Sequence, residues 1–141
     1  MTKYKVYLDD YRTPIDPTWI VVRNYSEFVS TILERGIENI HLISFDHDLA
    51  DVHYDPSRWM DVDSYEDDNE KTGLDCAKWL VEHVTKVNSD LPRTVVHSAN
   101  PVGSVNIVNY INSFLRNDGK PATCFRGNIP HTVIKNNFFG N

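Results

Sequence analysis

Three short polar groups in this sequence each follow an apolar stretch that is typical of a buried strand. They are residues 9–10 after "KVYL", residues 46–48 after "LISF" and residues 97–100 after "TVV". If the three strands lie in one parallel sheet, their carboxyl ends share a rim, and ligands of such sheets bind there. A single charged turn would need no explanation. Three that converge predict a functional site.

Four aspartates supply the carboxylates of this predicted site. Clustered carboxylates repel one another unless a cation joins them, and hard oxygen ligands suit Mg²⁺ or Mn²⁺. We expect Asp10 and Asp46 to bind the metal, with Asp9 or Asp48 accompanying them. Capping of a helix or turn is the alternative role of Asp9 and Asp48.

Two histidines of the same groups are candidates for proton transfer. His47 and His97 could act as general acid and base beside Asp46, because imidazole titrates near neutral pH. The alternative for each is a purely structural hydrogen bond.

Four further residues are candidates for substrate binding. Ser98 and Asn100 lie at a strand-to-helix turn, where a hydroxyl, an amide and a helix N-terminus can contact a phosphate. Helix capping is an equal alternative for Asn100. Arg12 and Arg126 could pair with phosphate oxygens, or could be ordinary surface residues.

Alternating strands and helices must position these groups. Strands are expected at 3–8, 19–23, 41–46, 93–99 and 121–127, and helices at 24–36, 72–86 and 100–119. This alternation predicts an α/β fold with a parallel sheet covered on both faces. The tail, residues 128–141, is expected to add at most an edge strand.

Length and charge narrow the class of protein. The 141 residues fit one domain, 1–141. Residues 46–70 hold ten acidic residues and one basic residue, a net charge of −9, while the rest of the chain is +3 with 13 basic and 10 acidic residues. This balance argues against binding of long nucleic acid and leaves a small phosphorylated ligand or one RNA end.

No segment of the sequence suggests export or a membrane. The N-terminus, "MTKYKVYLDD", becomes acidic within ten residues, and no apolar run is long enough to span a bilayer. The two cysteines form no CxxC pair. We therefore expect a cytoplasmic protein with reduced thiols, and its oligomeric state stays open.

Five motifs resemble a known family. The groups at the strand ends are similar to those of two-component receiver domains, and more closely to the receiver-like family of cyclic-phosphate processing proteins. The matching pieces, which span residues 8 to about 103, are "LDDYRTP", "W" followed by "VRNYSEF", "SFDHDL", "TGLDCAKWL" and "VHSANPVG". The resemblance implies a three-layer, mostly parallel, five-stranded receiver-like (flavodoxin-like) sheet.

Three departures separate this chain from ordinary receivers. Only residues 11–18 lie between Asp10 and Trp19, so the first crossover helix is expected to be lost. The final strand ends in "FRGNIP", with Arg126 where receivers have a lysine. An acidic insert follows the third strand, between Leu49 and Thr72, and a solvated loop is its expected structure.

These observations lead to one hypothesis and two alternatives. The hypothesis is a metal-dependent phosphoesterase that acts on a cyclic phosphate, either a 2′,3′-cyclic RNA end or a small cyclic nucleotide. In it, His97 activates water, His47 protonates the leaving oxygen, and Arg12, Ser98 and Asn100 orient the phosphate. The first alternative is a module that sequesters a cyclic nucleotide without turnover. The second is a signalling receiver phosphorylated on Asp46.

Overall fold

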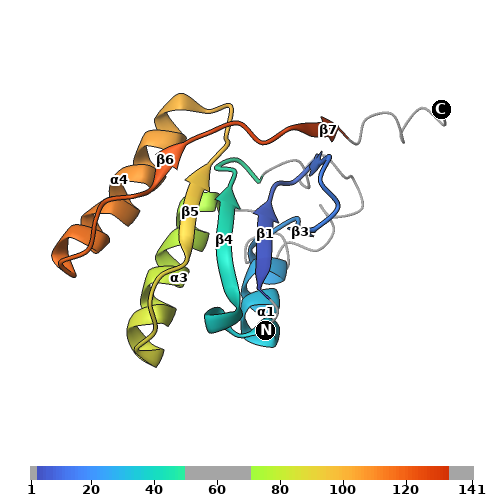
Figure 1. Ribbon diagram of the computed structural model, residues 1–141. Coiled ribbons are helices and arrows are strands. Elements are labelled where there is room, and N and C mark those ends of the chain that lie inside the picture. The colour runs from blue at the N-terminus through green and yellow to red at the C-terminus, as the bar shows by residue number, and fades with distance from the viewer. Residues whose placement is uncertain (1–2, 50–70, 134–141) are drawn as a thin grey trace, which may run out of the picture.

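The computed structural model describes residues 3–49 and 71–133. Its five main strands are β1 (Tyr4–Leu8), β3 (Trp19–Val22), β4 (Ile40–Phe45), β5 (Arg93–Val96) and β6 (Phe125–Arg126). They form one parallel sheet in the order β3-β1-β4-β5-β6 (Figure 1). Counted along the chain this is the flavodoxin-like order 2-1-3-4-5. Ligands of such sheets bind where the order reverses, which here is between β1 and β4.

The backbone register brings the predicted strand ends into one row. Leu8, at the end of β1, is in register with Phe45, and Phe45 is in register with Val96. The ladder continues past the strands: the Asp46 N–H donates to the Leu8 carbonyl at 3.0 Å, and the His97 N–H donates to the Phe45 carbonyl at 2.9 Å. Residues that follow these three strands therefore meet at one edge of the sheet.

The helices begin where the sequence predicts. They are α1 (Tyr25–Arg35), α3 (Gly73–Val87) and α4 (Pro101–Asn117), and a 3-10 turn, η1 (Ile37–Asn39), follows α1. The side chains of Asn24 and Asn100 cap α1 and α4, and Thr72 forms a capping box with Asp75 at the start of α3. These caps satisfy N–H groups that a helix leaves unpaired in its first turn.

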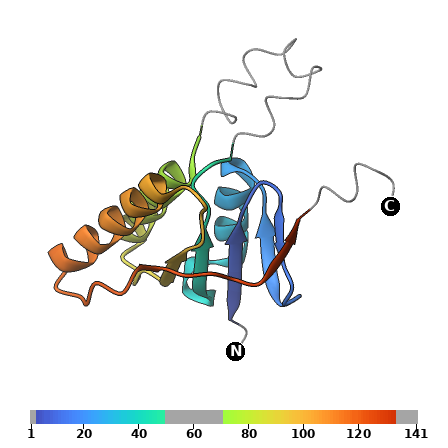
Figure 2. The same ribbon diagram turned by 90° about the horizontal axis from the view of Figure 1, so that it is seen from above.

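All three described helices pack on one face of the sheet. One apolar core joins them to the strands, and it includes Val6 and Leu8 but not Tyr7, which points to the other face. Figure 2 shows the helices side by side along that face. The expected third layer is therefore not present in the described residues. The reason is local: the chain between β1 and β3 is too short for a helix, and the described chain after β6 continues in an extended form.

A small antiparallel ribbon replaces the lost crossover helix. It pairs β2 (Arg12–Pro14) with β7 (His131–Val133), so the described part of the tail returns to the start of the chain. Residues 134–141 and most of the acidic insert, residues 50–70, lie outside the described residues. Among the helices that the structure describes, none combines the length and apolar content needed to cross a bilayer.

Candidate metal and phosphate site

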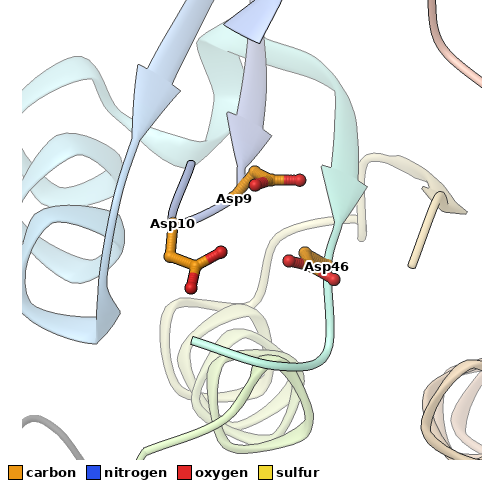
Figure 3. A group of neighbouring side chains, drawn as sticks. All are labelled: Asp9, Asp10 and Asp46. Atoms are coloured by element: carbon orange, nitrogen blue, oxygen red, sulfur yellow. The ribbon is translucent and has the colours of Figure 1, made fainter. Parts of the chain in front are cut away.

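Three carboxylates converge at the carboxyl ends of β1 and β4. Asp9, Asp10 and Asp46 each offer one oxygen, and these oxygens lie within 4.8 Å of one another. Figure 3 shows the carboxyl groups of Asp10 and Asp46 pointing toward each other, with Asp9 above them. Because three hard oxygen donors with room for water suit Mg²⁺ or Mn²⁺, the donor set fits the predicted metal.

Burial sets the two inner carboxylates apart electrostatically. Burial raises the pKa of Asp46 to about 6, the charge of Asp9 adds to this effect, and a hydrogen bond from Ser98 opposes it. Burial would also raise the pKa of Asp9, but hydrogen bonds from His97 and from two backbone N–H groups outweigh it and lower that pKa. Two like charges so close cannot both ionise easily without a cation.

The raised pKa of Asp46 predicts that the metal-free protein loses stability as pH rises. The folded state keeps a proton on Asp46 up to pH about 6, whereas the unfolded chain releases it near 3.8, so the free energy of unfolding falls between these values. The pKa difference corresponds to at most about 3 kcal/mol. Urea unfolding with a chelator across this range checks it. Asp46→Asn should lack the fall, and a difference from wild type that stays constant with pH would contradict the prediction.

Asp9 is held by hydrogen bonds to both of its carboxylate oxygens. Its Oδ1 accepts from the backbone N–H groups of Tyr11 at 2.9 Å and Arg12 at 2.7 Å. Its Oδ2 lies 2.9 Å from His97 Nε2 and 3.9 Å from an Arg12 nitrogen. Asp9 thus fixes the turn after β1, which leaves Asp10 and Asp46 as the less constrained carboxylates of the cluster.

His97 lies in a buried chain of hydrogen bonds. Its Nδ1 is 2.6 Å from the Ser44 hydroxyl, its Nε2 meets Asp9, and its ring stacks on Tyr7 with centroids 4.3 Å apart. The Asp9 carboxylate accepts from Nε2–H, so in neutral His97 the Nδ1 atom accepts from Ser44. Both ring nitrogens are therefore engaged by protein groups, and the His97 side chain is only 2% exposed.

His47 has a more open position. Its Nδ1 lies 3.0 Å from Asp48, so Nδ1 carries the hydrogen and Nε2 is the nitrogen that can exchange a proton with a ligand. Its ring packs directly on Gly103, where an added Cβ would lie 2.3 Å from the ring. Asp48 also accepts from the Asn100 side chain at 3.3 Å. Asp48 and Asn100 thus orient His47 and cap α4, and Asp48 lies outside the three-carboxylate cluster.

The other predicted phosphate contacts line a common cavity beside the cluster. Arg12, Ser98 and Arg126 surround a space of about 270 Å³. Arg12 donates to the His97 carbonyl at 3.3 Å, and the Ser98 hydroxyl donates to Asp46. The structure therefore brings together the acidic cluster and the basic side chains that the sequence assigns to phosphate.

Three supporting residues received no role from the sequence. Arg23 donates to the carbonyls of Asp9 and Arg12 and to Thr13 Oγ1, and so holds the turn that carries Asp9 and Asp10. Ser44 is a polar residue inside an apolar strand. Gly73 lies so close to Asp46 that a Cβ would be 1.8 Å from its carbonyl oxygen. Arg23 and Gly73 do occur in the matching motifs "VRNYSEF" and "TGLDCAKWL", which was the available signal.

Residues 4–113 match the family model described as "Cyclic-phosphate processing Receiver domain". The parallel sheet and its helices are accordingly a receiver-like α/β fold. Comparison with curated proteins found no match, and comparison with solved structures found none.

Proposed function

The chain belongs to the family of cyclic-phosphate processing receiver domains, and from this premise we propose that it is a metal-dependent phosphoesterase. The observation that supports this best is the juxtaposition of three carboxylates with a basic cavity at the strand-order reversal. A divalent cation held by Asp10, Asp46 and Asp9 would polarise the phosphoryl group of the ligand. The substrate is a cyclic phosphodiester.

The side chains around the cluster divide the remaining tasks. Arg12 and Ser98, at the junction of cluster and cavity, orient the phosphate. Water attacks phosphorus, one P–O bond of the ring breaks, and the leaving oxygen takes up a proton. His47 is the better placed proton carrier because its Nε2 remains for the ligand.

His97 has a different task in this proposal from the one that the sequence suggested. With both nitrogens engaged and little exposure, it is placed to position Asp9 and not to activate water. Second-shell partners of this kind orient metal ligands, and their loss typically lowers metal affinity by roughly 10–100-fold.

A panel of cyclic phosphates tests the proposed function. The protein is incubated with 2′,3′-cyclic and 3′,5′-cyclic nucleotides and with RNA that ends in a 2′,3′-cyclic phosphate. Each is tested with Mg²⁺, with Mn²⁺ and with a chelator, and the products are read by mass spectrometry. We expect metal-dependent conversion of at least one compound to a phosphomonoester. Tight binding of an intact compound would instead support sequestration, and neither binding nor turnover would refute the proposal.

A further inference from the structure

The C-terminal segment forms a strap over the candidate site. The strap, residues 125–133, begins at β6, where Val96 is in register with Arg126, and ends at β7, which pairs with β2. Its middle is tied down too, since the Ile15 N–H donates to the Pro130 carbonyl at 2.9 Å. Figure 1 shows the strap crossing the carboxyl ends of β5, β4 and β1. It therefore encloses whatever binds at these ends.

The cavity under the strap has two walls. One wall is the rim of the sheet with Arg12, Ser98 and Ala99, and the other is the strap with Arg126, Asn128 and His131. An adjoining cavity of about 320 Å³ shares Ser98, Arg126 and Asn128. Together they reach the size of ordinary small-ligand pockets, which start at roughly 300 Å³.

The charges in this space favour an anion at two separate places. None of the described residues that line either cavity is acidic. Arg12 is committed to the cluster, since it bonds the His97 carbonyl and lies 3.9 Å from Asp9. Arg126 forms no ion pair with any described residue. Its strand is two positions from β4, a backbone separation of roughly 10 Å from Asp46.

We propose that Arg126 binds a second anionic group of the substrate, distinct from the cyclic phosphate held beside the acidic cluster. The substrate class is then a cyclic phosphate that carries a further phosphate, such as a 5′-phosphorylated nucleotide 2′,3′-cyclic phosphate or an oligonucleotide end. This inference rests on the proposed function and narrows its substrate. The second phosphate pairs with a guanidinium, which can donate two parallel hydrogen bonds to it.

A matched pair of ligands tests this inference. Adenosine 2′,3′-cyclic phosphate and its 5′-phosphorylated form are compared by calorimetry in the presence of Mg²⁺, with Asp46→Asn available as a non-hydrolysing background. We expect the 5′-phosphate to tighten binding to the protein roughly tenfold or more. In Arg126→Gln this ratio should fall close to one. Arg93→Gln, the same change at the exposed start of β5, should keep the ratio.

Each other outcome overturns the inference in a recognisable way. Equal binding of the two ligands by the unmodified protein would refute the second anionic site and leave the proposed function standing. A preference that Arg126→Gln keeps would move that site to another residue and refute the role of Arg126. If Arg126→Gln weakens both ligands equally, Arg126 contacts the cyclic phosphate itself. Failure of either ligand to bind would refute the proposed function and the inference with it.

Discussion

Asp46→Asn is expected to lower metal-dependent turnover of a cyclic phosphate by more than roughly 100-fold. Asparagine has nearly the same shape but lacks the negative charge that a divalent cation needs at the centre of the cluster. For the same reason the rise in melting temperature on addition of Mg²⁺ or Mn²⁺ should disappear. Initial rates and thermal unfolding curves, measured on the same preparations with and without metal, check both effects.

Two matched variants control this prediction. Asp90→Asn changes an exposed aspartate at the other end of the sheet and should keep both turnover and the metal-induced shift. Asp48→Asn should keep the shift, because Asp48 lies outside the three-carboxylate cluster. Equal metal-induced shifts in wild type and Asp46→Asn would remove Asp46 from the metal site.

Alanine at the two histidines should have opposite signatures. His47→Ala should lower the rate by roughly 10²–10⁴-fold, because it removes the proton carrier, while metal binding stays close to normal. His97→Ala should lower the melting temperature and the metal affinity, because it leaves Asp9 and Ser44 without their buried partner. Turnover, metal affinity and melting temperature measured on both variants separate the two roles.

The same experiment has a natural control and two adverse outcomes. His41 is an exposed histidine near the start of β4, and His41→Ala should change none of the three quantities. Near-normal turnover in His47→Ala would refute its role in proton transfer. A folded His97→Ala protein with unchanged metal affinity and strongly reduced turnover would return His97 to the role of base.

Much of the site could be predicted because parallel topology places the ends of consecutive strands at one edge. The polar groups after "KVYL", "LISF" and "TVV" meet in the structure as that rule requires. The division of roles within the site could not be predicted. Whether His97 is exposed or buried depends on the register with Phe45 and on the hydroxyl of Ser44 two strands into the core. Neither contact leaves a local pattern in the sequence.

The elements that enclose the site were predicted less well than those that carry it. Capping residues and apolar periodicity mark α1, α3 and α4, and the structure confirms all three. The pairing of β7 with β2 joins segments more than a hundred residues apart, and each is only three residues long. Such short strands have no periodicity to detect. The placement of all described helices on one face likewise follows from which crossovers are missing, not from any helix itself.

Hydrolysis in water enriched in ¹⁸O tests the central claim most directly. The full-length protein, saturated with Mn²⁺ or Mg²⁺, is incubated with the cyclic phosphate that it converts best, and product and protein are both weighed by mass spectrometry. The account predicts a phosphomonoester that carries one ¹⁸O on phosphorus, formed only with metal and lost in Asp46→Asn. Recovery of intact ligand at saturating protein, or a lasting phosphoryl adduct on the protein itself, would contradict it.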